Sequence, residues 1–370
     1  MNASLPTADA LRAALAGLLD GLPPTKAAQA VDRLIANYRG ATPTDAPVLR
    51  DRADVAAYAA YRMPATFEAV RSALTALRAA APEWAPATHI DIGGGTGAAT
   101  WAVAEAWETA EAWEEWADWP GQAHRGPDRP GGGSSGGPGA APRTTVLDWA
   151  EPALALGREL AEVSGVPALR AARWQRARIG KALKLDATDL VTVSYVLNEL
   201  TPDDRAALVA EAARAAQAVV IVEPGTPDGY ERIIAAREQL TAAGLRIAAP
   251  CPHSAACPIE PGTDWCHFAA RVSRSSLHRQ VKGGSLAYED EKFSYVAAGR
   301  FPVTPATARV TRRPQIRKGQ VLLDLCTPDD GLRRDTVTKR HGALYKEARD
   351  AEWGDAWPPP AGDAWPAPPA

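Results

Sequence analysis

The chain has 370 residues, 46% of them hydrophobic, and a formal net charge of -3. This length allows two or three globular domains with a sizeable core. No segment reaches the ~18 apolar residues of a membrane-spanning helix, and the N-terminal stretch lacks the basic region and apolar run of a secretory signal. Composition therefore excludes a membrane protein and predicts a soluble, cytoplasmic one with no membrane partner.

Residues 1–83 are predicted to form an N-terminal helical region. Apolar residues recur at helical spacing in residues 11–22, 27–40 and 53–80. Residues 40–47 and Pro64 are expected to break the run. We expect these helices to pack on the domain that follows.

Residues 88–107 predict a strand, a glycine-rich turn and a helix, in the order THIDIGGGTGAATWAVAEAW. The strand is expected to end at Asp91, and the turn contains Gly93, Gly94, Gly95 and Gly97. Glycine lets the backbone approach a nucleotide-like ligand closely, and the helix N-terminus offers unpaired N–H groups. The acidic residue before the glycines is typical of S-adenosylmethionine sites in class I methyltransferases, and no GxxxxGK[ST] motif indicates a triphosphate. A structural turn is the alternative.

Residues 84–248 alternate between strands and helices, which predicts a mostly parallel, doubly wound, Rossmann-like sheet. Strands are expected at residues 144–147, 190–195 and 219–222, and a helix at 152–164. Asp148, at the end of the second strand, is placed to accept hydrogen bonds from ribose hydroxyls. Ser194, Asn198 and Glu223 are expected near the pocket mouth, although a helix cap or a loop hydrogen bond would equally explain each.

Two segments cannot bury a core and are predicted to be disordered. They are the glycine-rich insertion 120–143 and the proline-rich tail 357–370. The helix before the insertion carries five tryptophans interleaved with acidic residues, namely Trp101, Trp107, Trp113, Trp116 and Trp119. We expect them to pack against the sheet and the N-terminal helices, and a partner-binding face is the alternative.

The predicted C-terminal domain, residues 249–356, holds the four cysteines of the chain: Cys251, Cys257, Cys266 and Cys326. An even cysteine count in a reducing compartment favours a metal site over two disulfides. Four thiolates suit tetrahedral zinc and the common iron-sulfur clusters alike. The spacing matches neither the CxxC of most structural zinc sites nor the CxxxCxxC of radical enzymes. Wide, irregular loops favour a cluster and leave zinc open.

Residues 251–350 carry a net charge of +6, against -9 for the rest of the chain. The positive charge forms three strips: Arg271, Arg274, His278, Arg279 and Lys282; then Arg309, Arg312, Arg313, Arg317 and Lys318; then Arg333, Arg334, Lys339, Arg340, Lys346 and Arg349. A solvated face would explain any single strip. Three strips beside the candidate metal ligands predict RNA binding, because neutralising a phosphate backbone needs several cations on one surface.

Residues 35–355 resemble a known family, the methyltransferase-like proteins associated with the small ribosomal subunit in mitochondria and in bacterial relatives. The C-terminal motifs that carry the resemblance are CPHSAACP, DWCHFAARVSR, KGGSLAYEDEKFSYVA, LCTPDDGLRRDTVTK and YKEARDAEWGD. The upstream motifs are AYAAYRMPATF, DIGGGTG, SYVLNEL and IVEPGTPDGY. The glycine-rich insertion and the proline-rich tail depart from the family pattern.

The resemblance implies a class I methyltransferase-like fold, a role in assembly of the small ribosomal subunit, and a [4Fe-4S] cluster held by Cys251, Cys257, Cys266 and Cys326. The residues expected to bind S-adenosylmethionine are Asp91, Gly93, Gly94, Gly95, Gly97, Asp148, Ser194 and Asn198. We therefore expect a monomer that binds 16S-type rRNA.

Two alternatives stay open at this point, an active rRNA methyltransferase with Asn198 or Glu223 near the accepting atom, and a non-catalytic assembly factor that binds zinc. No [DN]PP[YF] motif follows the strand at Ser194, and no cysteine lies in the sheet domain. Catalytic residues are accordingly not assigned.

Overall fold

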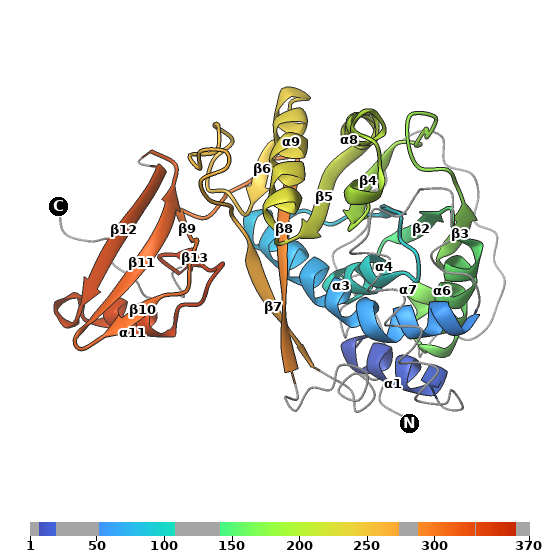
Figure 1. Cartoon of the computed structure of the whole chain (residues 1–370), viewed down its shortest axis with the longest axis horizontal. Coiled ribbons are helices and arrows are strands. Elements are labelled where there is room, and N and C mark those ends of the chain that lie inside the picture. The colour runs from blue at the N-terminus through green and yellow to red at the C-terminus, as the bar shows by residue number, and fades with distance from the viewer. Residues whose placement is uncertain (1–6, 20–51, 108–140, 274–287, 330, 360–370) are drawn as a thin grey trace.

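The computed structural model describes residues 7–19, 52–107, 141–273, 288–329 and 331–359. These residues form an eight-stranded sheet between helices and a five-stranded sheet that lies at one end of the molecule (Figure 1). None of the helices in the described ranges is both long enough and apolar enough to cross a membrane.

The N-terminal helices are α1 (Thr7–Leu19) and α3 (Arg52–Ala80). Helix α3 runs through Pro64, where the sequence predicted a break. Its buried residues Met63, Phe67 and Leu74 lie on one face that packs into the core, and this burial offsets the hydrogen bond that proline removes. The predicted helix at residues 27–40 lies outside the described part of the chain.

The large sheet has the strand order β3-β2-β1-β4-β5-β8-β6, and β7 pairs with β8. Its strands are β1 (Thr88–Ile92), β2 (Arg143–Asp148), β3 (Arg173–Arg176), β4 (Thr188–Ser194), β5 (Ala216–Pro224), β6 (Arg246–Ala249), β7 (Phe268–Ser273) and β8 (Tyr288–Gly299). Strands β1 to β5 are parallel, and β8 runs antiparallel to β5. The predicted class I methyltransferase-like, Rossmann-like sheet is confirmed. Its strand order reverses between β1 and β4, the switch point at which such sheets bind ligands.

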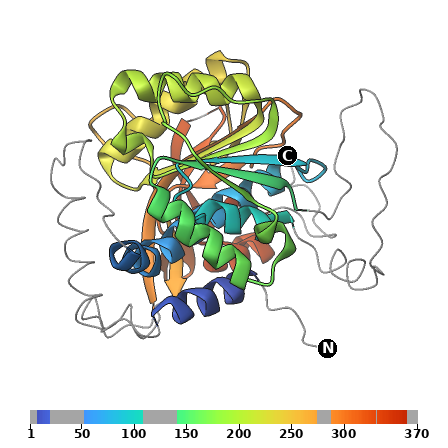
Figure 2. The ribbon, with the colours of Figure 1, turned by 90° about the vertical axis from the view of Figure 1, so that its right-hand side faces the viewer.

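Helices cover both faces of this sheet (Figure 2). One face packs against α1, α3, α4 (Ala98–Trp107) and α6 (Glu151–Val163), and the other against α8 (Pro202–Ala215) and α9 (Pro227–Ala242). The short elements α7 (Pro167–Arg170) and η1 (Leu197–Glu199) follow α6 and β4. Trp101 and Trp107 of α4 are buried in the first of these cores, as expected. Trp113, Trp116 and Trp119 fall outside the described residues.

The expected domain boundary at residue 249 divides this sheet, because β7 and β8 come from the predicted C-terminal domain. Strand β8 pairs with β5 from Ala218↔Gly299 to Pro224↔Phe293. Its first five residues are only partly buried or exposed, and its last seven are buried. Because the first half of β8 is charged, the sequence pattern did not identify β8 as a core strand. The large sheet therefore extends to Gly299.

The small sheet contains β9 (Ala308–Val310), β10 (Gln315–Arg317), β11 (Gln320–Thr327), β12 (Gly331–Thr338) and β13 (Ala356–Trp357), with η2 (Lys339–His341) and α11 (Ala343–Asp350) after β12. Strand β12 pairs along the whole of β11, and β9 and β10 pair with different parts of it. Alternate β11 residues Val321, Leu323 and Leu325 enter its core.

Each of the two segments predicted to be disordered includes, at one end, a residue that the structure places in a strand. Arg143 begins β2, so the insertion stops before it. Trp357 lies in β13 and is 5% exposed, because it packs into the core of the small sheet. Residues 120–140 and 360–370 lie outside the described part of the chain.

Candidate functional site

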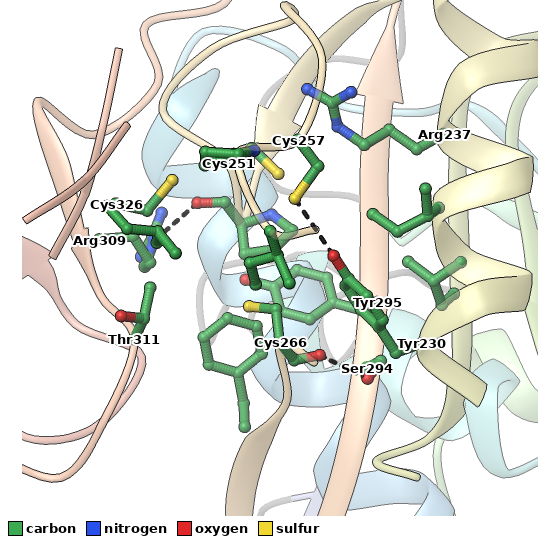
Figure 3. A pocket seen from close by; sticks show the side chains of 17 residues that line it. Tyr230, Arg237, Cys251, Cys257, Cys266, Ser294, Tyr295, Arg309, Thr311 and Cys326 are labelled. Atoms are coloured by element: carbon green, nitrogen blue, oxygen red, sulfur yellow. Dashed lines mark hydrogen bonds between the residues drawn. The ribbon is translucent and has the colours of Figure 1, made fainter. Parts of the chain in front are cut away.

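The four cysteines line one cavity of about 40 Å³ (Figure 3). Cys251 and Cys257 lie in the loop between β6 and β7, Cys266 lies just before β7, and Cys326 lies in β11. The volume exceeds the ~10–15 Å³ that one water molecule requires. Tertiary structure thus brings together ligand candidates that the sequence separates by up to 75 positions.

The cavity lies where the large and small sheets meet. Its other walls include Tyr230 and Arg237 from α9, Tyr295 from β8 and Arg309 from β9. The side chain of Arg309 is buried, and it donates from Nε to the Pro250 carbonyl at 2.8 Å and from Nη1 to the Gly354 carbonyl at 2.9 Å. This residue therefore joins the start of the cysteine loop to the small sheet.

Arg237 and Ser294 hold the rest of the loop through backbone carbonyls. Arg237 Nη2 donates to His253 O at 2.9 Å and to Ala255 O at 2.6 Å, and Ser294 Oγ donates to Cys266 O at 2.7 Å. These bonds come from elements outside the loop. The sulfur atoms are thus presented by a fixed backbone.

The chemistry of the cavity fits a soft, positively charged centre. Burial, with repulsion between the thiolates, raises the pKa of Cys251 and Cys266, and raises that of Cys326 to about 12. Metal binding stabilises the thiolates and releases their protons. Tyr230 Oη lies 3.2 Å from Cys257 Sγ, and His253 Nε2 lies 3.8 Å from Cys326 Sγ. Sequence reasoning missed Tyr230, which belongs to a separate helix.

The arrangement of the cysteines is the same starting point for one ion and for a cluster. Tetrahedral zinc, with bonds of ~2.3 Å, draws its four sulfurs to roughly 4 Å from one another. In the described part of the chain, no three His, Cys, Asp or Glu side chains are already grouped as metal ligands. The four thiols surround a shared cavity.

The glycine turn lies between β1 and α4, at the switch point of the large sheet. Gly93, Gly95 and Gly97 have φ angles of 65°, 53° and 89°, which favour glycine. A Cβ atom at Gly95 would meet only Asp148 Oδ2, at 3.8 Å, so the space beside it is open. Gly95 N donates to Asp148 Oδ2 at 2.9 Å, and Ala150 N donates to Oδ1 at 2.8 Å. The carboxylate keeps lone pairs for a ligand hydroxyl.

Asp91, which the sequence predicted to contact the cofactor, lies inside the sheet. It is fully buried, and its oxygens accept hydrogen bonds from Thr192 and Thr100, each at 2.9 Å. A Cβ at Gly94 would lie 2.7 Å from Asp91 Oδ2. Asp91 therefore braces the turn and α4 from within the sheet. Sequence reasoning missed Thr192 because it comes from a strand about 100 positions away.

The residues expected at the pocket mouth have different environments. Ser194 Oγ is buried and has no hydrogen-bond partner among the described residues. Asn198 is exposed in η1. Glu223 is fully buried, and it accepts from Leu197 N at 3.0 Å and from Arg232 Nε at 2.6 Å. Glu223 therefore holds η1 in place and is not a free base.

Three of the sequence motifs meet at the end of β4. Tyr195 follows β4 with a φ of 61°, unusual for a residue with a side chain. Its hydroxyl donates to Glu291 of β8 at 3.0 Å. Arg62 of α3 pairs with Glu291 at 3.1 Å and lies 5.3 Å from the centre of the Tyr195 ring. This network fixes α3 and β8 around the end of β4, and sequence reasoning missed it.

Residues 52–119 and 139–358 match the family described as mitochondrial small ribosomal subunit Rsm22. The chain belongs to the Rsm22 family. The resemblance seen in the sequence is thereby confirmed. The human ribosome assembly protein METTL17, mitochondrial, is 28% identical to this Rsm22-family chain over 316 residues, or 81% of this chain and 62% of the human protein. The Saccharomyces cerevisiae ribosome assembly protein RSM22, mitochondrial, is 22% identical over 179 residues, 30% of this chain and 28% of the yeast protein. The chain thus spans less than two thirds of the length of either relative.

Solved methyltransferase structures align more loosely with this Rsm22-family chain. A putative RNA methyltransferase from Pyrococcus horikoshii aligns with a TM-score of 0.34 and 11% identity, covering 73% of this chain and 96% of that one. Magnesium protoporphyrin IX methyltransferase from Synechocystis aligns with a TM-score of 0.37 and 13% identity, covering 65% and 85%. The fold assignment rests on the strand order of the large sheet.

The basic strips of the Rsm22-family chain do not form one uniform surface. Besides the buried Arg309, Arg312 pairs with Asp264, and Arg334 pairs with Asp324 through two bonds of 2.6 and 3.0 Å. These arginines stabilise the fold. Arg271 and Arg333 also have acidic partners, Asp290 and Asp335. Arg274, His278, Arg279 and Lys282 lie outside the described residues.

Proposed function

We propose that this chain is an S-adenosylmethionine-binding, [4Fe-4S]-bearing protein that acts in assembly of the small ribosomal subunit through rRNA. The observation that carries the proposal is the convergence of four cysteines on one cavity in a chain of the Rsm22 family. The relatives METTL17 and RSM22 are named as ribosome assembly proteins, which supports the same role here.

The cluster part of the proposal favours [4Fe-4S] over zinc. Four thiols around a shared cavity suit a polynuclear centre, which such clusters bind through four cysteines. Tyr230 Oη and His253 Nε2 lie near two of the sulfurs and would orient them. Ligation by Cys326 and the loop cysteines joins β11 to the loop before β7, so the cluster stabilises the contact between the two sheets.

The cofactor part of the proposal assigns S-adenosylmethionine to the glycine turn. The open space beside Gly95, the lone pairs of Asp148 and the unpartnered Ser194 Oγ support it. Asp91 supports the site indirectly, by bracing the turn. The proposal does not include methyl transfer, since Glu223 is already bonded to Leu197 N and Arg232.

Anaerobically purified full-length protein tests the proposed function. We expect brown protein with about four iron and four sulfide per chain, and co-sedimentation with small ribosomal subunits. A colourless protein with one equivalent of zinc would overturn the cluster. Failure to sediment with small subunits would overturn the assembly role.

Gly95→Ala is expected to weaken binding of S-adenosylhomocysteine by at least about tenfold, or ~1.4 kcal/mol. The added methyl group enters the open space beside Asp148, where the cofactor is proposed to lie. Calorimetric titration measures the effect. Gly165→Ala is the matched control, because Gly165 also has a positive φ, 72°, with nothing within 4 Å of its Cβ. Both changes place alanine in the left-handed region of backbone space, which costs each variant ~1–2 kcal/mol of stability. Equal affinities in the two variants would contradict the assignment.

A further inference from the structure

One end of the small sheet gathers four cations from two segments. Across the β10–β11 turn, Arg317 pairs with Gln320, and Gln320 pairs in turn with Thr338 of β12. Lys339 N donates to the carbonyl of Gly319 in that turn at 3.1 Å. The strand register and this hydrogen bond therefore place the β10–β11 turn beside the residues that follow β12. The cations brought together are Arg317, Lys318, Lys339 and Arg340. We call these four residues the cationic end.

The charge of the cationic end is not neutralised by ion pairs within the described ranges. All four residues are exposed, and none has an ion-pair partner in the described ranges. Residues 311–323 and 336–346 contain no Asp or Glu. By contrast, Arg312 and Arg334 pair with carboxylates.

The surroundings of the cationic end are equally open. All three residues of β10 are exposed, and Ile316 is 60% exposed. The small sheet lies at the far end of the molecule from β2 and β3 (Figure 1). Cations on an edge strand also protect it from pairing with other strands. Of the four residues only Arg317 lies within a strand, β10, so that role does not account for Lys318, Lys339 and Arg340.

We propose that the cationic end binds the phosphate backbone of rRNA. This deepens the proposed function and rests on its RNA-binding part. Arginine binds phosphate in a bidentate manner and lysine binds it as a point charge. A protruding hairpin turn with four unpaired cations fits the backbone of a folded RNA better than a flat anionic bilayer, which would also require several apolar side chains to insert.

The test compares two full-length variants in which four cations are replaced by Gln. The first carries Arg317→Gln, Lys318→Gln, Lys339→Gln and Arg340→Gln. The matched control changes four exposed arginines of the large sheet and α6: Arg143, Arg158, Arg173 and Arg246. Binding to fluorescein-labelled, deproteinised 16S-type rRNA is measured by anisotropy between 50 and about 300 mM salt, and unfolding by circular dichroism.

We expect the first variant to bind the rRNA at least about tenfold more weakly than the wild-type protein. Each phosphate contact contributes ~0.7–0.9 to the slope of log K against log[salt], so loss of four contacts should reduce the magnitude of this slope by roughly 3. The control should retain the wild-type slope. A wild-type slope in both variants would overturn this assignment and leave the proposed function intact. Absence of RNA binding by the wild-type protein would overturn both. If the first variant instead loses only binding to phosphatidylserine vesicles, the surface is a membrane contact and the proposal is wrong.

Discussion

Replacing Cys326 by Ser is expected to remove the iron-sulfur cluster and to loosen the small sheet from the large one. Cys326 is the ligand that the small sheet contributes, and the other three precede β7. A group present at ~1,000 times its dissociation constant stabilises the folded state by about 4 kcal/mol, and this stabilisation is lost when the group no longer binds. Iron and sulfide analysis should show the loss of the cluster. Thermal unfolding and limited proteolysis between β8 and β9 should show the weaker contact.

Glu260→Gln is the matched control for Cys326→Ser. Glu260 is exposed in the same loop and lies outside the residues that line the cavity. The control should therefore keep wild-type iron content and protease resistance. The small sheet has a core of its own around Val321, Leu323 and Leu325, so we expect it to retain its fold in the Cys326→Ser variant. Full iron content in Cys326→Ser would show that Cys326 is not a ligand.

Asp91→Asn is expected to change how stability depends on pH. Burial raises the pKa of Asp91 from 3.8 to about 6. Between these values the folded state binds more protons than the unfolded state, so the contribution of Asp91 to stability falls as pH rises through this window. At ~1.4 kcal/mol per pH unit the total change is about 3 kcal/mol. The variant lacks this titration, and its amide still bonds both Thr100 and Thr192.

The measurement is the difference in free energy of unfolding between Asp91→Asn and the wild-type protein from pH 4 to pH 7.5. Taking this difference cancels the titration of other groups. As pH rises, the free energy of unfolding of Asp91→Asn should increase relative to that of the wild-type protein. Asp186→Asn is the control, because Asp186 is exposed. A level difference for Asp91→Asn would mean that the carboxyl titrates normally in the folded protein.

Local sequence predicted the strands that are buried on both faces. Strands β4 and β5 contain apolar runs, as parallel core strands usually do. Strand β3, with the sequence RWQR, lies at the edge of the sheet and is largely exposed. Half of β8 is charged. Neither pattern distinguishes these strands from loops, and the sequence therefore did not predict that β8 joins the large sheet beyond residue 249.

The sequence alone was enough to determine the family of this protein, the glycine turn and the set of four cysteines, because these depend on residue type and local spacing. Only the tertiary structure decided that the cysteines meet between two sheets, that Asp91 and Glu223 serve the fold, and that Arg309, Arg312 and Arg334 are buried or paired with carboxylates. Burial and pairing depend on partners distant in the chain. Arg309 and Pro250 lie 59 positions apart, and Asp91 and Thr192 101 positions apart.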